Sequence, residues 1–399
     1  MKNQENICFD LLLKGQTLVN AEKGIFEKKD IAIKNGKIAA ISENIPVTSA
    51  MKTIDLSGLL ITSGLIDMHS HFYPKFPVDQ DGLYGINPEA HFFRDGVCTA
   101  VDTGSCGARD FLSFKEQVID KSKVRLLAFV NIADGGMVNI DREQEPENFV
   151  PEIAAAIVNS YPKHLLGIKT AHYWVGKPFD EQHSAWASID ATIKAGELCQ
   201  KRVMIDFQPF LQERTYEELV LEKLRPGDIH THMYAKHFGI LDENGKVKQF
   251  LWDAKKRGVV FDLGHGSGSF VYSNAIPALA QGYYPDIIST DLYLPNVMGP
   301  VFGLTHVISK FLSMGMDLIE VIRRVTVAPA NIIGDPDLGR LIVGGNADIA
   351  VLRERTGDFG FSDCDGYKIT GDKRLECVMT IKDGDVVYDP DARALPQWE

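Results

Sequence analysis

The sequence lacks paired cysteines. Its six cysteines stand at wide, irregular spacings with no C-x-x-C pair, which is far too sparse for a disulfide scaffold. We therefore expect reduced and mostly buried thiols at Cys8, Cys98, Cys106, Cys199, Cys364 and Cys377.

Long apolar runs and basic clusters are also missing. No stretch approaches the roughly eighteen apolar residues of a membrane span, and the N-terminal MKNQENICFDLLLKG has no signal-like apolar segment. The 42 basic residues are outnumbered by 54 acidic ones, scattered along the chain, for a net charge of −12. Nucleic acid binding needs clustered Lys and Arg, so this balance argues against it. We expect a cytoplasmic protein with a small-molecule substrate and no membrane partner; assembly into a homo-oligomer stays open.

Both ends of the chain have the character of β-structure. Apolar and polar residues alternate in DIAIKNGKIAAI, which predicts a hairpin around Asn35-Gly36, and ECVMTIKDGDVVYDP predicts a second hairpin at Asp383-Gly384. We predict a small discontinuous β-sandwich domain formed by residues 1–57 and 338–399. Residues 58–337 would then be an insertion between its two parts.

The middle of the chain changes to short apolar runs that are mostly followed by amphipathic stretches such as GLTHVISKFLSMG. Eight such units indicate an α/β fold, a (β/α)8 TIM barrel. A doubly wound open sheet is the rival, but it would normally carry a Gly-rich nucleotide loop after its first strand, and DLGHGSGS follows the seventh and lacks the G-x-G-x-x-G spacing. The predicted strands are 61–66, 99–104, 125–133, 165–170, 203–207, 228–232, 259–263 and 287–291.

Residues that commonly bind metals follow the predicted barrel strands. The carboxyl ends of barrel strands face one mouth, so these side chains should converge although they are far apart in sequence. They are His69 and His71 in GLIDMHSH, Lys169 in GIKT, Asp206 in VMID, His232 in DIHTH and Asp291 in IISTD.

The HxH pair has a geometric reason to bind one cation. Side chains on a strand repeat with a period of two, so His69 and His71 point to the same side. Two surface histidines would be the ordinary alternative, but the position between an apolar strand and the barrel mouth favours a metal site.

The other candidates have ordinary alternatives too. Lys169 could be an ion-paired lysine, Asp291 a helix N-cap, and His232 a core histidine. His230 lies two residues before His232, and the strand period gives it the same side-chain direction. We favour His232 because it stands at the end of the strand.

The motif series resembles the amidohydrolase superfamily, in particular its dihydroorotase-like amidohydrolase/deacetylase group. The resemblance covers essentially the whole chain and includes the split β-sandwich. It implies a binuclear centre of divalent metals, Zn or alternatively Mn or Fe, bridged by a carboxylated lysine and a hydroxide. The matching segments are GLIDMHSH, GVCTAVDTGSCGA, GIKT, RPGDIHTH, VVFDLGHGSGSF, PDIISTD and VTVAPANIIGDPDLGRLIVGGNADIAVL.

The resemblance also implies a role for each residue. His69 and His71 would bind the more buried metal, and Asp291 would bind it while acting as the catalytic proton shuttle. Lys169 would be the N-carboxylated bridge, and His232 would bind the second metal. Two cations flanking one oxygen lower its pKa and polarise a carbonyl.

Two positions depart from the family pattern. Most relatives place a histidine where Asp206 stands; this carboxylate could be a metal ligand, a partner of a ligand, or the mark of a mononuclear site. The deacetylase group tends to have an arginine shortly after the bridging lysine, whereas this chain reads Lys169-Thr170-Ala171-His172-Tyr173. The usual substrate recognition of the group is therefore not expected to carry over unchanged.

Three further residues are candidates for substrate binding. Ser105 to Ala108 follow the second predicted strand and could present backbone N–H groups to an anionic substrate or form an ordinary turn. His265 could contact substrate or be a structural histidine, and Tyr173 could line the pocket or only pack. The function that these observations favour is metal-dependent hydrolysis of an amide, ester or cyclic amide bond in a small molecule. A mononuclear deaminase-like hydrolase and a metal-poor binding protein on the same fold are the alternatives.

Overall fold

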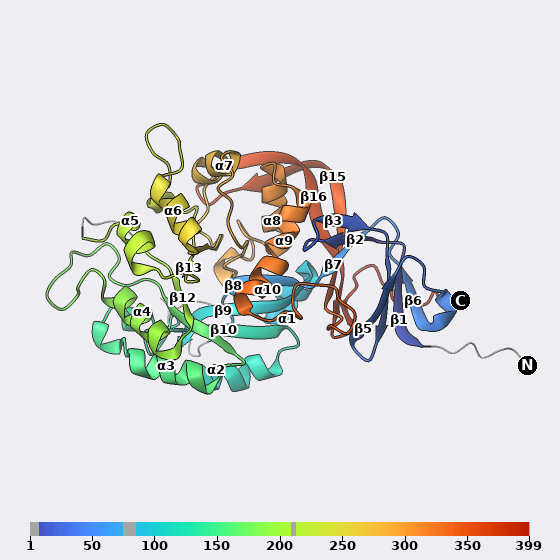
Figure 1. Cartoon of the computed structure of the whole chain (residues 1–399), viewed down its shortest axis with the longest axis horizontal. Helices are drawn as coiled ribbons and strands as arrows, with labels where there is room; N and C mark the ends of the chain where they lie inside the picture. The colour runs from blue at the N-terminus through green and yellow to red at the C-terminus, as the bar shows by residue number, and fades with distance from the viewer. Residues whose placement is uncertain (1–7, 75–84, 209–212, 399) are drawn as a thin grey trace, which may run out of the picture.

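The barrel sheet occupies the middle of the chain. The computed structural model describes residues 8–74, 85–208 and 213–398. All neighbours in this sheet are parallel, in the order β14-β13-β12-β11-β10-β9-β8 (Figure 1). The strands are β8 (Leu65–Ser70), β9 (Val97–Gly107), β10 (Arg125–Asn131), β11 (Leu165–Thr170), β12 (Arg202–Ile205), β13 (Ile229–His230) and β14 (Val260–Phe261).

Residues 287–292 close this sheet into a barrel. Parallel bridges join Asp262 to Ile287 on one side and Ser70 to Leu292 on the other. The backbone N–H of Asp291 donates to the carbonyl of His69 at 2.7 Å. The segment predicted as the eighth strand therefore holds the eighth position, although its pairing is too sparse for a regular strand. The predicted TIM barrel is confirmed.

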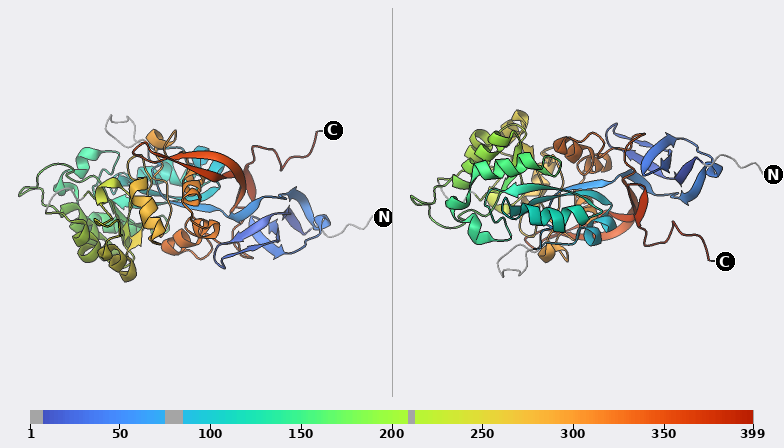
Figure 2. Two further views of the ribbon diagram at one scale, coloured as in Figure 1. Left: turned by 90° about the horizontal axis from the view of Figure 1, so that it is seen from above. Right: turned by 90° about the horizontal axis from the view of Figure 1, so that it is seen from below.

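Helices cover the outside of the barrel (Figures 1 and 2). In α8 the buried Leu304, Val307, Ile308 and Phe311 recur at spacings of three and four, as the sequence pattern predicts. The helices are α1 (Pro88–Phe92), α2 (Phe111–Gln117), α3 (Pro151–Ser160), α4 (Ala187–Cys199), α5 (Tyr216–Glu218), α6 (Gln249–Arg257), α7 (Tyr272–Ala280), α8 (Leu304–Ser313), α9 (Leu318–Arg323) and α10 (Val327–Ile333).

Strands from both termini form two further sheets beside the barrel, and the long β15 and β16 extend over α8 toward α7 (Figure 1). The first has the order β5-β4-β1-β6, with β1 (Phe9–Lys14), β4 (Asp30–Lys34), β5 (Lys37–Ser42) and β6 (Ala50–Asp55). The second has the order β17-β16-β15-β7-β2-β3, with β2 (Thr17–Asn20), β3 (Ile25–Glu27), β7 (Leu60–Ser63), β15 (Ile349–Ser362), β16 (Lys368–Lys382) and β17 (Asp385–Tyr388). Buried residues of both sheets share one hydrophobic core, as a sandwich requires.

Both predicted hairpins are present in these sheets. Asn35 and Gly36 join β4 to β5 with φ of 50° and 73°, and Asp383 and Gly384 join β16 to β17 with φ of 49° and 87°. Two successive residues with positive φ are typical of the type I′ turn, whose twist matches that of the flanking strands.

The prediction of one strand over 61–66 is wrong. The chain forms β7 and β8 with Gly64 between them, and β7 belongs to the terminal sheet. A Cβ atom at Gly64 would lie 2.5 Å from the sulfur of Cys98, so glycine allows the close approach where the chain passes from one sheet to the other. The division into residues 1–57 with 338–399 and 58–337 stays a prediction.

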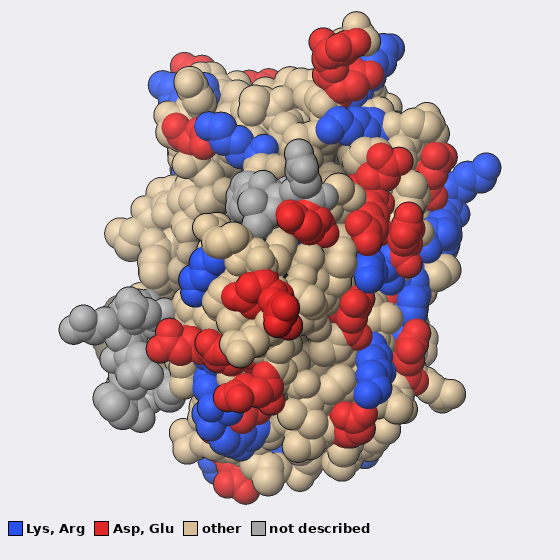
Figure 3. All heavy atoms as spheres, turned by 90° about the vertical axis from the view of Figure 1, so that its left-hand side faces the viewer, with Lys and Arg blue, Asp and Glu red and all other residues tan. Residues whose placement is uncertain are grey.

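The surface agrees with the composition. On the face opposite the terminal sheets, acidic and basic side chains are intermixed (Figure 3). No helix in the described ranges is both long and apolar enough to cross a membrane. Four of the cysteines are buried, Cys364 is half-buried and Cys8 is exposed, and all six are free thiols, as expected.

Candidate metal centre

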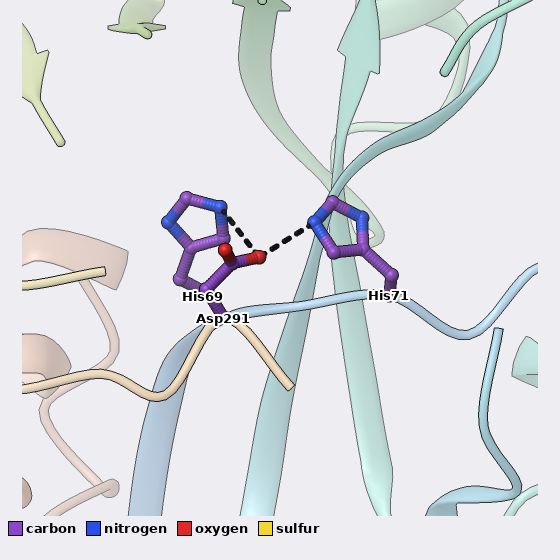
Figure 4. A group of neighbouring side chains, drawn as sticks. All are labelled: His69, His71 and Asp291. Carbon is purple, nitrogen blue, oxygen red and sulfur yellow. Dashed lines mark hydrogen bonds and ion pairs between the residues drawn. The ribbon is translucent and has the colours of Figure 1, made fainter. Parts of the chain in front are cut away.

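His69, His71 and Asp291 meet at the mouth of the barrel (Figure 4). His69 lies in β8, His71 follows that strand, and Asp291 lies in the segment that closes the barrel beside it. Oδ1 of Asp291 is 3.0 Å from Nε2 of His71 and 3.5 Å from Nε2 of His69. All three residues are buried, and their ligand atoms lie within 4.8 Å of one another. Such a group can hold one cation.

The other nitrogen of each imidazole is already engaged. Nδ1 of His69 is 2.9 Å from Oγ1 of Thr231 and 3.1 Å from Oδ2 of Asp262. Nδ1 of His71 is 2.9 Å from Oγ of Ser105. Oxygen partners of this kind fix the ring orientation of metal-binding histidines. Both rings thus direct Nε2 toward Asp291.

The electrostatics of His69 also suit a metal ligand. Burial, reinforced by the positive charge of Lys169, holds the pKa of His69 well below its ordinary value. The imidazole is therefore neutral, which is the form that binds a cation.

Asp206 and His232 form a second pair of potential ligands. They follow the neighbouring strands β12 and β13, and Oδ2 of Asp206 is 3.6 Å from Nε2 of His232. Nδ1–H of His232 donates to the carbonyl of Gly264 at 2.6 Å, so Nε2 is left facing Asp206. The ring centroids of His232 and His69 are 5.1 Å apart. The structure thus brings this pair beside the first group.

The pair also has complementary charges. Burial alone would raise the pKa of Asp206, but the positive charge of His232 outweighs it and holds that pKa well below its usual range. For His232 burial opposes protonation, and the carboxylate of Asp206 raises the pKa nonetheless.

Lys169 lies beside His69, and the charges of Asp206 and Asp291 act on it. It is 0% exposed, and Nζ is 3.4 Å from Nε2 of His69 and 3.8 Å from Sδ of Met204. No carboxylate oxygen of the residues that the structure describes forms an ion pair with it, so the alternative of an ion-paired lysine does not fit. Burial lowers the pKa of Lys169, although Asp206 and Asp291 oppose that shift. A buried amine that loses its proton readily can react with carbon dioxide.

The expectation that His230 shares the side-chain direction of His232 is wrong. His230 packs with Tyr216, Phe238 and Phe261 outside the strand, whereas Thr231 points inward to His69. His232 has a φ of 62°, and this left-handed conformation interrupts the two-residue period of the strand. The turn brings His232 to the mouth.

The helix N-cap alternative for Asp291 does not fit either. The nearest following helix is a short 3₁₀ turn, Leu294–Asn296, whose N-cap is Tyr293. Asp291 itself has a φ of 50°, and its carbonyl accepts from the side chain of Asn296 at 2.7 Å. Its carboxylate is thereby free to face the two histidines.

The segment DLGHGSGS is explained by close packing against these ligands. A Cβ atom at Gly264 would lie 2.7 Å from Nδ1 of His232, and one at Gly266 would lie 2.6 Å from Oδ2 of Asp291. Both glycines also have positive φ. Glycine is therefore required here to let the chain approach the ligands.

Ser105 has a different setting from the one we expected. It lies within β9, which runs to Gly107, and its N–H donates to Asp102 at 2.9 Å instead of facing the mouth. The interpretation that this N–H is offered to a substrate does not fit, because the donor is already used. The hydroxyl holds His71.

His265 and Tyr173 are buried. Lys310 Nζ donates to Nε2 of His265 at 2.7 Å, and Nδ1–H of His265 donates to the carbonyl of Gly266. The hydroxyl of Tyr173 donates to the carbonyl of Ser184 at 3.1 Å. Both side chains are committed to internal contacts, which fits their structural alternatives better than substrate contact.

Sequence reasoning missed a second charged pair near Lys169. Nδ1 of His172 is 2.9 Å from Oε2 of Glu143, and Oε1 of Glu143 accepts from Asn131 at 2.7 Å. Burial would lower the pKa of His172, but Glu143 raises it to about 9, and the charge of Asp206 adds to this effect. The deacetylase group tends to have an arginine near the position of His172. Glu143 is the last residue of the short 3₁₀ helix Ile140–Glu143, which no motif marks.

Comparisons with known proteins agree with this geometry. No family model matches the chain. It is 30% identical to a deacetylase of Enterococcus faecalis over 96% of this chain and 99% of that protein. It is also 30% identical to a deacetylase of Agrobacterium fabrum over 83% of this chain and 80% of that protein.

Solved structures give the same assignment. A crystal structure of an adenine deaminase has a TM-score of 0.84 and 29% identity, and covers 96% of this chain and 100% of its own. A dihydroorotase has a TM-score of 0.78 and 26% identity over 95% and 99%. The chain belongs to the amidohydrolase superfamily. It is a hydrolytic enzyme that acts on C–N bonds, and its family generally uses divalent metals.

Proposed function

We propose that this amidohydrolase cleaves an amide or ester bond of a small acylated molecule at a centre of two divalent cations. The observation that carries the proposal is the convergence of His69, His71 and Asp291 beside Asp206 and His232, with Lys169 next to His69.

The donor set fits divalent metals such as zinc. Neutral imidazole and carboxylate are donors that suit Zn, Mn and Fe. Asp206 and His232 would bind the second cation, and a carboxylated Lys169 would bridge the two. Cations bound here would lower the pKa of a water molecule and polarise the substrate carbonyl.

Asp291 is suited to move the proton. Its carboxylate is held near Nε2 of both His69 and His71 and is free of any helix cap. It would accept a proton from water as the oxygen adds to the carbonyl carbon. It would then give that proton to the leaving nitrogen or oxygen as the bond to the acyl group breaks.

The relatives point to the kind of bond that this enzyme cleaves. The chain aligns with most of the length of two proteins named deacetylases, which supports an N-acyl amino acid or an acylated hydroxy acid as the substrate. The likeness to the dihydroorotase structure supports a cyclic amide as the substrate. Deamination is the second candidate, supported by the likeness to a structure of an adenine deaminase. Ammonia release distinguishes deamination from deacylation.

Metal content and a lysine variant test this function. We expect about two ions per chain after purification with zinc or manganese, and metal-dependent hydrolysis of acetylated probes. Lys169→Ala should lose metal and activity, with partial rescue by short carboxylic acids that replace the bridge. Lys256→Ala, at an exposed lysine of α6, is the matched control. Metal content near zero in the wild type, or full turnover in Lys169→Ala, would refute the proposal.

A further inference from the structure

His172 is held in one orientation beside the strand that carries Lys169. It follows the end of β11 by two residues, and its Nδ1–H donates to Glu143 at 2.9 Å. Glu143 is 2% exposed, and its other oxygen accepts from Asn131. A buried carboxylate that is bonded on both oxygens is a fixed counter-charge, and it keeps the imidazole protonated.

The backbone around His172 is clamped as well. The side chain of Gln144 donates to the carbonyl of His172 at 2.9 Å and accepts from the N–H of Trp174 at 3.1 Å. Glu143 and Gln144 thus fix the side chain and the main chain together.

The pair lies next to the metal centre. Asn131 is the direct neighbour of Lys169 across β10 and β11. A Cβ atom at Gly104 would lie 2.9 Å from Cγ of Lys169 and 3.5 Å from Cβ of Asn131, so all three strand ends meet here. His172 follows the carboxyl end of β11, which faces the mouth, and the charges of Asp206 and Lys169 act on it.

His172 has one donor left to offer. Its side chain is 35% exposed, and Nε2 makes no hydrogen bond to any residue in the described part of the chain. Arg214 is another cation on which the charge of Asp206 acts, but its side chain is not available to bind a substrate. It is 2% exposed, donates to the carbonyl of Tyr173 and lies over the ring of Phe207.

We propose that His172, positioned by Glu143, binds a carboxylate of the substrate through Nε2–H. This inference rests on the proposed hydrolase function and narrows its substrates to small acylated acids with a free carboxylate. A charged donor next to the mouth forms a charge-assisted hydrogen bond with a carboxylate, whereas a neutral carboxamide forms a weaker one.

Two matched ester probes test the inference on the zinc-loaded full chain. O-acetylglycolate and O-acetylglycolamide carry the same acetyl ester and differ only in carboxylate against carboxamide. We expect kcat/KM to favour the carboxylate, and His172→Gln to reduce that preference by roughly tenfold to a hundredfold, the range of a hydrogen bond to a charged group. His172→Lys should retain much of the preference. His164→Gln, a histidine at the opposite end of β11, should retain all of it.

Glu143→Gln is a second variant that removes the counter-charge and leaves His172 in place. It should reduce the preference in the same direction, and it decides the matter if His172→Gln does not fold. An unchanged preference in the folded variants, with both esters still hydrolysed, overturns the carboxylate site and leaves the proposed function intact.

Absence of turnover of both probes by the wild-type enzyme would instead count against the proposed function. Calorimetric titration with the same probes then tests whether His172 binds the carboxylate. Tighter binding of O-acetylglycolate that is lost in His172→Gln supports it. Equal affinity for both probes, or binding of neither, overturns it.

Discussion

Asp206 and His232 face each other across the ends of two neighbouring barrel strands, with Oδ2 and Nε2 3.6 Å apart. Each residue shifts the pKa of the other toward its charged form: Asp206 raises the pKa of His232, and His232 lowers that of Asp206. A carboxylate at this strand end therefore does not disrupt the mouth. It offers one oxygen ligand where most relatives are expected to offer a nitrogen.

Asp206 should be required for the second ion. We expect Asp206→Ala to bind about one metal per chain and to lose about 2 to 4 kcal/mol of transition-state stabilisation, or roughly 30- to 1,000-fold in kcat/KM. Asp206→His should keep two metals because imidazole is also a ligand. Elemental analysis and steady-state kinetics measure both effects. Asp253→Ala, at an exposed carboxylate of α6, serves as control, and full activity of Asp206→Ala would show that the residue holds no metal.

Ser105 should act through His71. Its hydroxyl is 2.9 Å from Nδ1 of His71, and loss of such a partner typically costs roughly 10- to 100-fold in metal affinity or activity. We expect Ser105→Ala to show that loss in a competition titration with a chelator. Ser160→Ala, on the exposed side of α3, should bind metal as the wild type does. Equal affinity in the two variants would mean that the orientation of His71 does not depend on Ser105.

Two glycines of one loop should respond differently to alanine. At Gly266 a Cβ atom would lie 2.6 Å from Oδ2 of Asp291, whereas at Gly268 it would meet nothing within 4 Å. Gly266→Ala also places a side chain at a φ of 55°, which costs about 1 to 2 kcal/mol. We expect a clear loss of kcat in Gly266→Ala and a stability change within about 0.5 kcal/mol in Gly268→Ala. Similar kinetics for both would refute the proposed packing role.

The pair of His172 and Glu143 should make stability depend on pH. The folded-state pKa of His172, about 9, is above the ordinary 6.5, so the stabilisation is complete below 6.5 and is lost as the pH rises through about 9. With a chelator present, the free energy of unfolding of the wild type should fall more between about pH 6 and about pH 9.5 than that of His172→Gln. Urea unfolding at both pH values measures this difference. Parallel curves would show that the pair does not stabilise the fold.

The sequence was sufficient for features that depend on local backbone rules. The turns at Asn35-Gly36 and Asp383-Gly384 need residues that accept positive φ, and alternation around them predicts paired strands. Parallel strands of a barrel end at one mouth, so the convergence of His69 and Asp291 could be predicted from their places after apolar runs. Residue type and barrel topology together determine these features, and they do not depend on how individual side chains pack.

Only the tertiary structure decided which nitrogen or oxygen faces the centre. Thr231, just after β13, and Ser105, in β9, orient the imidazoles, and no spacing rule relates them to His69 or His71. The direction of His232 depends on a single positive φ that breaks the strand period. Nε2 of His265 accepts from Lys310, which reaches it from α8. Each of these outcomes is set by hydrogen bonds between buried groups that must be satisfied wherever the fold places them, because an unpaired buried polar group is costly. A sequence shows which groups need partners, and only the folded chain selects the partners.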